Sequence, residues 1–369
     1  MLKMIKRTTK KLASFAFSNR IIITFMHAMG NIKTPLTEML NIKYPIILAP
    51  MFLVSNEEMS IEAIKAGIAP CIPALNWRKD EQMRAGLKEI KEKAGGPIGI
   101  NLIVNKSNIH YKRQLASCVD MKVDFIITSL GSPEEVIKQC KPHGIKVFCD
   151  VVDVAYAEKC EALGADAVIA VNKEAGGHAG PMMSTELIPL LKSKVSIPVI
   201  SAGGVGDGAG IWKRINQDGA IGVSMGSIFI ATPEAPVSQE YKQACVDYGA
   251  DDIVMTTKIS GSPCTVINTP YVQDVGTKQN WLEKMLSKNK KLKKYVKMLT
   301  FYKGMKSVEK AAFTSTYETV WCAGPSIEYT KSIRPVKDIT ADLIAQYHGV
   351  NSSEEKKVAA MENSVVRRN

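Results

Sequence analysis

Residues 165–180 read ADAVIAVNKEAGGHAG, an apolar run that leads into a glycine-rich segment with one histidine, His178. A short run that is apolar on both faces is typical of a buried parallel strand. Gly176 and Gly177 lack a Cβ, so the backbone there can approach a flat or charged ligand closely. An imidazole in such a segment can exchange protons near neutral pH. The stretch predicts a strand of an α/β fold with a site at its C-terminal end; an ordinary βα turn is the alternative interpretation.

Three further segments repeat this arrangement of an apolar strand followed by small residues. They read PIILAPM at 45–51, IPVISAGGVGDG at 197–208 and GAIGVSMGS at 219–227. The last two are consecutive, and each ends in glycine with a small polar residue. Consecutive loops of this kind hold phosphate in α/β barrels through backbone N–H groups. The two loops therefore predict a phosphate-binding site. The alternative, that their glycines only allow close packing of helices, is less favoured.

From residue 42 onward, short apolar runs alternate with amphipathic, charged ones. Eight strands alternating with helices predict an α/β protein with a (β/α)8 TIM barrel rather than a doubly wound sheet. The expected strands are 45–49, 68–74, 97–103, 123–128, 145–149, 165–171, 197–201 and 220–224. The expected helices are 57–66, 80–93, 110–120, 133–141, 153–163, 184–193 and 207–217.

The regular alternation stops after the eighth strand. We expect the barrel to comprise residues 41–250 plus 326–350, the second part returning as the helix that closes the barrel. Residues 251–325 are expected to form a helical insertion or lid, because their second half has apolar residues at helical spacing among lysines. Residues 1–40 are expected to be a basic N-terminal arm and 351–369 a disordered tail.

The net charge of +12 is unevenly distributed along the 369 residues. Residues 1–40 hold a net +6 and residues 278–310 a net +9, so the rest of the chain is close to neutral. Neither segment matches a nucleic-acid-binding module, so we expect no nucleic-acid partner. Two interpretations of the lysines in residues 278–310 remain open: they form a solvated surface, or they attract an anionic substrate or a membrane surface.

No apolar run reaches bilayer length, which argues against stable membrane insertion. For the basic N-terminal segment, an organellar presequence is the alternative to a surface arm.

The eight cysteines are scattered, with no CxxC pair and no cluster with histidine at metal-ligand spacing. This pattern predicts neither a metal site nor a disulfide framework. It indicates a reducing compartment and therefore a cytoplasmic location.

Taken together, the segments resemble the nitronate monooxygenase (2-nitropropane dioxygenase-like) family of FMN-dependent TIM barrels. The resemblance covers roughly residues 40–270. It rests on PIILAPMFLVSN, INLIV, DFIITSLGSP, GADAVIAVNKEAGGHAG, PVISAGGVGDG, GVSMGSIFIATPEA and SGSPCTVIN. The resemblance implies a non-covalent FMN across the barrel mouth, with His178 facing the reactive ring nitrogen and the substrate.

The resemblance also implies which residues contact FMN. Along the ring and its loop these are Pro50, Met51, Asn101, Gly176 and Gly177. At the phosphate they are Gly203, Gly204, Met225, Gly226 and Ser227. Lys173 and Ser201 are further expected cofactor contacts. Many family members have a Gln-Gly pair where this chain has Val171 and Asn172; valine offers no amide, so Asn172 or Lys173 is expected to replace the glutamine.

The activity implied is oxidative denitrification of an alkyl nitronate with O2. His178 would either remove the α-proton of a neutral nitroalkane or, when protonated, bind the nitronate. The alternative enzyme is an enoyl-thioester (enoyl-ACP) reductase that uses NAD(P)H, since the same motifs serve both. A barrel that binds FMN without catalysis is a third interpretation. The expected partners are a small-molecule substrate and O2, and assembly into a homo-oligomer is compatible with the sequence.

Overall fold

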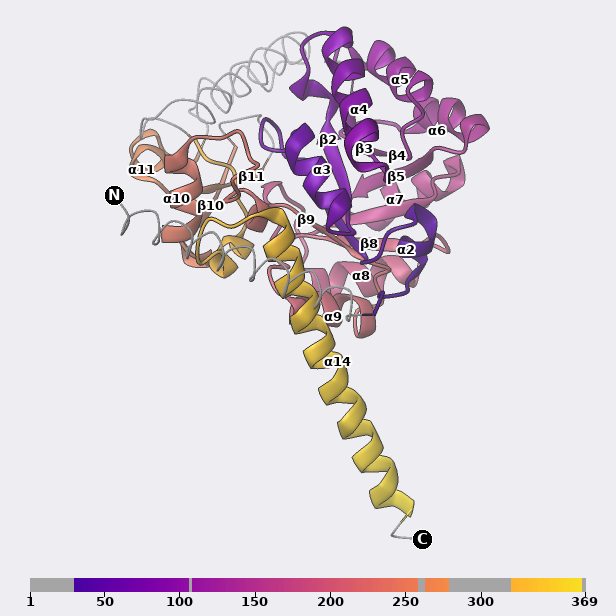
Figure 1. Cartoon of the computed structure of the whole chain (residues 1–369), viewed down its shortest axis with the longest axis vertical. Coiled ribbons are helices and arrows are strands. Elements are labelled where there is room, and N and C mark those ends of the chain that lie inside the picture. The colour runs from indigo at the N-terminus through magenta and orange to yellow at the C-terminus, as the bar shows by residue number, and fades with distance from the viewer. Residues whose placement is uncertain (1–29, 106–107, 258–262, 279–319, 367–369) are drawn as a thin grey trace, which may run out of the picture.

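A computed structural model describes residues 30–105, 108–257, 263–278 and 320–366. Eight parallel strands close into a barrel, and helices between successive strands surround it (Figure 1). The predicted (β/α)8 barrel is confirmed. Its strands are β1 (Ile46–Leu48), β2 (Ala69–Pro73), β3 (Gly99–Ile103), β4 (Phe125–Ser129), β5 (Lys146–Val151), β6 (Ala167–Val171), β8 (Val199–Ala202) and β9 (Val223–Met225).

Each of the first seven barrel strands is followed by a helix. These helices are α3 (Glu57–Lys65), α4 (Asp80–Ala94), α5 (Tyr111–Asp120), α6 (Glu134–Cys140), α7 (Val154–Leu163), α8 (Ser184–Lys192) and α9 (Gly208–Asn216). Their starts follow the capping residues of the sequence: the side chains of Asn56, Asp153 and Asp207 accept hydrogen bonds from backbone N–H groups of α3, α7 and α9. The strand and helix boundaries agree with the expected ranges to within a few residues.

The barrel interior is a packed hydrophobic core. Phe125 and Phe148 meet at its centre with ring centroids 5.4 Å apart, and Ile47, Ile169 and Ile200 pack in the same cluster. Every second residue of a strand points inward, so the inward positions at the C-terminal strand ends lie above this core. Most of the residues that the sequence predicts for the site lie at or just beyond those ends.

A short helix, α2 (Pro35–Leu40), closes the N-terminal end of the barrel. Leu36 and Leu40 are buried in the same cluster as the barrel interior, and Thr34 caps the helix start. Residues 30–40 therefore belong to the barrel, and the predicted arm boundary at residue 40 is wrong for this stretch. The reason is that two leucines four residues apart put an apolar stripe on one face, which packs against the barrel floor.

Between β9 and the last helix lies an insertion that is only partly helical. Its described part contains α10 (Gln239–Asp247), β10 (Ile253–Thr256), β11 (Cys264–Ile267) and α11 (Pro270–Val275). β10 and β11 pair antiparallel, and β11 pairs in turn with β7 (Gly177–His178), which belongs to the loop after β6. The insertion was expected to be helical, and this expectation is wrong for β10 and β11. Their sequences, IVMT and CTVI, are rich in β-branched residues, which favour strands. The amphipathic pattern at 281–310 lies outside the described residues.

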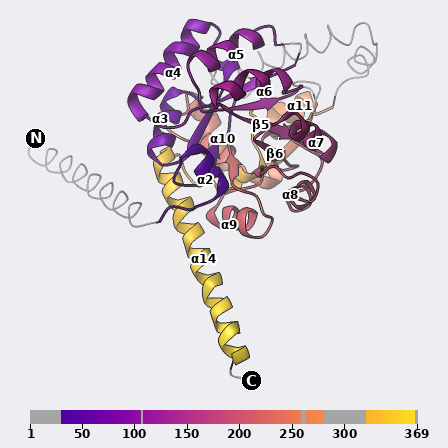
Figure 2. The ribbon, with the colours of Figure 1, turned by 90° about the vertical axis from the view of Figure 1, so that its right-hand side faces the viewer.

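The last helix, α14 (Val336–Val366), packs against α9 and α3 and so completes the helical ring. Its later turns project away from the barrel (Figures 1 and 2). The expected disordered tail at 351–369 is wrong as far as Val366, because the backbone is helical to that residue. A helix already formed by packing extends at little cost through good helix formers such as those in the EEKKVAAM run.

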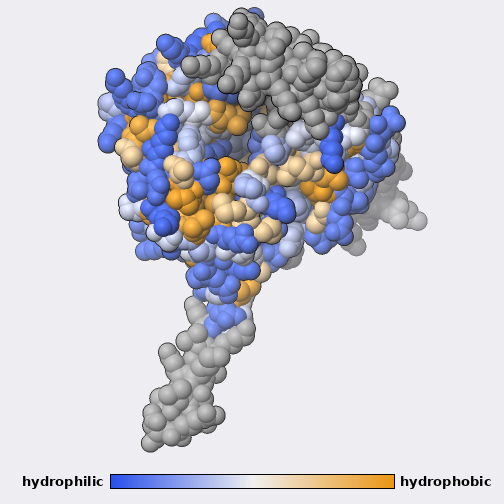
Figure 3. All heavy atoms as spheres, turned by 180° about the vertical axis from the view of Figure 1, so that it is seen from behind, coloured by the Kyte–Doolittle hydropathy of each residue, from blue (hydrophilic) through white to orange (hydrophobic). Residues whose placement is uncertain are grey.

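The surface of the described residues is mostly hydrophilic, with hydrophobic patches between (Figure 3). Among these residues, none of the helices combines the length and the apolar character that crossing a membrane requires.

Candidate active site

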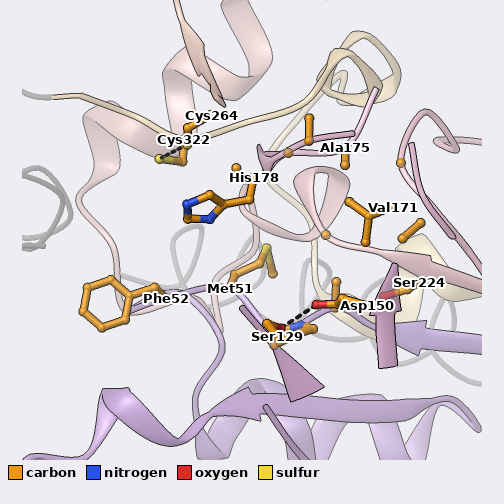
Figure 4. A pocket seen from close by; sticks show the side chains of 18 of the residues that line it. Met51, Phe52, Ser129, Asp150, Val171, Ala175, His178, Ser224, Cys264 and Cys322 are labelled. Carbon is orange, nitrogen blue, oxygen red and sulfur yellow. Dashed lines mark hydrogen bonds between the residues drawn. The ribbon is translucent and has the colours of Figure 1, made fainter. Parts of the chain in front are cut away.

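A cavity of about 660 Å³ opens at the C-terminal ends of the barrel strands. Its floor and walls include strand-end residues such as Asn101 of β3, Asp150 of β5, Val171 of β6 and Met225 of β9. Its upper wall comes from β7, β11 and residues 320–326 (Figure 4). The volume is that of a small-molecule or cofactor site. The location is where barrel enzymes hold their reacting groups.

Most of the sequence-predicted site residues meet in this cavity. The ones that line it are Pro50, Met51, Asn101, Gly176, Gly177, His178, Gly203, Gly204, Met225, Gly226 and Ser227. They come from five separate parts of the chain, which only the closed barrel brings together.

Lys173 and Ser201 do not line the cavity. Lys173 is exposed, and its backbone N–H donates to the carbonyl of Met182 at 2.7 Å. Ser201 is fully buried on β8, between inward-facing Ile200 and Ala202, so its side chain points to the helical layer. Neither residue is therefore among those that surround the cavity.

One end of the cavity presents backbone N–H groups that have no partner. Among the described residues, the amides of Gly204, Gly226 and Ser227 donate no hydrogen bond, whereas the Gly203 amide continues the ladder between β8 and β9. They lie at the ends of the neighbouring strands β8 and β9, whose pairing places Ala202 beside Ser224. Unpartnered backbone donors are rare in protein interiors, and a cluster of them is suited to an anion such as phosphate.

Asn172 holds the two glycine-rich loops together. Its Nδ2 donates to the carbonyl of Gly203 at 3.0 Å, and its Oδ1 accepts from the N–H of Glu174 at 2.8 Å. Gly203 has φ +109°, and a Cβ there would lie 2.5 Å from the nitrogen of Ala175. The glycine is thus required by the close approach of these loops. Asn172 is fully buried and does not line the cavity, whereas Val171 does.

His178 lies on β7, a two-residue strand rather than a free loop. Its partner across the ladder is Cys264 of β11. The hydroxyl of Thr265 donates to the carbonyl of Ala175 at 2.7 Å, which ties β11 to the same segment. The imidazole is accessible from the cavity and points into it (Figure 4). The surrounding walls remove bulk water, and this desolvation lowers the pKa of His178 below its ordinary value.

A chain of polar side chains crosses the cavity floor. Nδ2 of Asn101 donates to the hydroxyl of Ser129 at 2.8 Å and to the carbonyl of Ile127 at 3.1 Å. The Ser129 hydroxyl donates to a carboxylate oxygen of Asp150 at 2.5 Å. Burial raises the pKa of Asp150 to about 6, against the opposing effect of that hydrogen bond. Both N–H groups of Asn101 are occupied, so its carbonyl oxygen is the group that it can offer to a ligand.

The cavity residues outside the predicted set include Asp150, Cys264 and Cys322. Of the two acidic residues after β5, Asp153 caps α7, whereas Asp150 lines the cavity. Alternation along β5 contains the signal for Asp150, because Phe148 points into the barrel and residue 150 shares its face. No local pattern indicates the two cysteines, since the insertion brings them to the cavity.

This chain is similar to known proteins in both sequence and fold. The sequence profile of the family described as nitronate monooxygenase matches residues 105–346. A (3aS,4S,5R,7aS)-5-hydroxy-7a-methyl-1-oxo-octahydro-1H-indene-4-carboxyl-CoA dehydrogenase of Mycobacterium tuberculosis is 30% identical over 245 residues, 66% of this chain and 68% of that protein. A probable nitronate monooxygenase of Staphylococcus saprophyticus is 28% identical over 286 residues, 65% of this chain and 80% of that protein. The solved structure of FabK from Thermotoga maritima superposes with a TM-score of 0.77 at 27% identity, covering 88% of this chain and 99% of that one.

Proposed function

Because this chain belongs to the nitronate monooxygenase family and is therefore an oxidoreductase, we propose that it is an FMN-dependent nitronate monooxygenase that oxidises alkyl nitronates with O2. The observation that carries the proposal is that one cavity of the described residues is lined by three unpartnered amides, those of Gly204, Gly226 and Ser227, and by the imidazole of His178. The amides suit the phosphate of a mononucleotide, and the imidazole suits proton transfer.

The residues present fit FMN. The amides of Gly204, Gly226 and Ser227 would hold its phosphate. The largely apolar walls around Pro50 and Met51, together with the carbonyl oxygen of Asn101, would hold the ring. When bound, FMN supplies the redox chemistry with substrate and O2, which protein side chains cannot perform.

His178 is the residue that we assign to proton transfer. Its lowered pKa leaves the imidazole neutral at pH 7, which is the form that accepts a proton. This favours the first of the two roles expected from the sequence, removal of the α-proton of a neutral nitroalkane, over binding of a nitronate by a cationic imidazolium. A nitronate has already lost this proton, so its oxidation would depend less on His178.

The first experiment is the visible spectrum of the purified protein, followed by anaerobic titration with ethylnitronate and with NADPH. Flavin absorbance that is bleached by ethylnitronate supports the proposal. Absence of flavin even after incubation with FMN contradicts it.

The second experiment compares His178→Asn on two substrates. We expect kcat/KM for neutral nitroethane to fall by about 10²–10⁴-fold, with a much smaller loss for ethylnitronate. His143→Asn, in the exposed turn after α6, is the control and should match the parent on both. Equal losses on both substrates would remove the proton-transfer role from His178.

A thioester oxidoreductase, of the enoyl-thioester reductase type that uses NAD(P)H, is the second candidate. It is favoured by the relative at 30% identity, whose name describes a dehydrogenase of a carboxyl-CoA. The same anaerobic titration separates the two functions: bleaching by NADPH supports the reductase, whereas bleaching by ethylnitronate alone supports the monooxygenase. The basic segment 278–310, considered for docking an acidic carrier, lies outside the described residues.

A further inference from the structure

Two cysteines meet at the upper wall of the cavity. Cys264 begins β11, and Cys322 lies on the segment that runs beside this strand, where the N–H of Ile267 donates to the carbonyl of Trp321 at 2.9 Å. Their Sγ atoms are 3.9 Å apart. Figure 4 shows the two thiols directed toward each other, next to the imidazole of His178. Both residues line the cavity.

The two thiols differ in access. Cys264 is 3% exposed, whereas Cys322 is partly exposed. The other six cysteines of the chain are all buried, and none of them lines the cavity. A reagent that enters the cavity can therefore reach Cys322, with Cys264 directly behind it.

We propose that Cys264 and Cys322 form a thiol–disulfide exchange site that reacts with a small-molecule disulfide entering the cavity. Cys322 is the attacking thiol and Cys264 the resolving thiol. This assignment rests on the position of the two thiols and on their different access from the cavity. It does not depend on which substrate the enzyme oxidises.

The acid–base properties of the pair agree with these roles. The hydrogen bond from the Cys264 thiol lowers the pKa of Cys322, against the effect of burial. The same contact, together with burial, raises the pKa of Cys264 well above its ordinary value. The thiolate is the nucleophile in exchange, so the accessible sulfur is also the more reactive one.

The reaction has two steps. In the first, the Cys322 thiolate bonds to one sulfur of the disulfide RSSR, the RS–SR bond breaks, and one RS⁻ leaves and takes up a proton. In the second, Cys264 loses its proton, its sulfur bonds to Cys322, and the second RS⁻ leaves as a thiol. The two cysteines are oxidised by two electrons, and RSSR is reduced to two RSH.

Formation of the disulfide would move the part of the cavity wall that carries the two cysteines. The sulfurs must approach from 3.9 Å to about 2.05 Å, the length of a disulfide bond. The segment that carries Cys322 also holds Gly324, whose N–H donates to the Ser227 hydroxyl at 2.8 Å. Cys322 also offers its carbonyl to the Tyr241 hydroxyl at 2.6 Å. The redox state of the pair is thus linked mechanically to the amide-rich end of the cavity.

The test is thiol mapping of the native full-length protein. The protein is incubated with glutathione disulfide, quenched with N-ethylmaleimide under denaturing conditions, and mapped by peptide mass spectrometry. We expect the number of alkylated cysteines to fall from eight to six, with a Cys264–Cys322 bridge that dithiothreitol reverses. Cys264→Ser should stop at a glutathione adduct on Cys322, and Cys322→Ser should leave Cys264 alkylated. Cys118→Ala, in the helical layer, is the control and should form the bridge as the parent does.

Several outcomes would overturn the proposal: eight alkylated cysteines in the native parent protein, a bridge between another pair, or a glutathione adduct on Cys322 that never resolves. The parent map needs no variant, so poor folding of a variant does not weaken the test. It also needs no turnover, so its result is separable from that of the proposed activity.

Discussion

Asn172 donates a hydrogen bond to the carbonyl of Gly203 at 3.0 Å and so joins the loop after β6 to the loop after β8. One loop leads to His178 and the other offers amides to the cavity. The relative position of the two halves of the candidate site depends on this side chain.

We expect Asn172→Ala to lower the free energy of unfolding by about 1–3 kcal/mol, because the half-buried Gly203 carbonyl and the Glu174 N–H lose their partner. FMN affinity should fall with it. Chemical denaturation and FMN titration measure the two effects. Asn216→Ala, an exposed amide on α9, is the matched control and should change stability by less than about 0.5 kcal/mol. Unchanged FMN affinity in Asn172→Ala would show that the loops keep their positions without it.

Gly203→Ala should be more damaging than its small change in size suggests. The residue has φ +109°, and the added Cβ would lie 2.5 Å from a backbone nitrogen that has no room to move. We expect a loss of roughly 1–3 kcal/mol of stability and loss of FMN binding. Gly249→Ala is the control, since its φ is −114° and nothing lies within 4 Å of the added Cβ. Similar stability of the two variants would contradict the assigned loop contact.

The pH dependence of the proposed activity follows from the lowered pKa of His178. With neutral nitroethane, kcat/KM should lose half of its value only at a pH below about 6.5, the ordinary histidine pKa. The loss occurs as the imidazole takes up a proton. A pH–rate profile checks this, and His178→Asn should lack that acidic limb. An acidic limb that persists in the variant would assign the titration to another group.

Asp150→Asn should stabilise the protein at pH 8 but not near pH 4. The carboxyl has a folded-state pKa of about 6 and an unfolded value near 3.8, so between these values the folded state binds more protons. The unfolding free energy of the parent therefore falls as pH rises through 6, by up to about 3 kcal/mol. Urea unfolding at several pH values measures the difference. The exposed Asp251→Asn should follow the parent at every pH. A constant gap between parent and Asp150→Asn would mean that the raised pKa is absent.

The local pattern of the chain was enough to predict the barrel itself. Eight apolar runs separated by amphipathic ones encode strands and helices through residue spacing, and the glycines after β6, β8 and β9 mark where backbone approaches a ligand or another loop. The cavity residues from Pro50 to Ser227 were expected from the family resemblance, which agrees with the rule that barrel strands all end at the same face.

Long-range pairing decided the rest, because spacing along the chain does not encode it. The placement of His178 on a strand requires β11, almost ninety residues later in sequence, to pair with the loop after β6. The contact between Cys264 and Cys322 requires the insertion to fold back beside that strand. Ser201 directly precedes a glycine-rich loop in the sequence, whereas strand alternation turns its side chain to the helical layer. Local sequence determines which secondary structure each segment can form. Which segments lie together around the cavity is determined only by the packing of the folded chain.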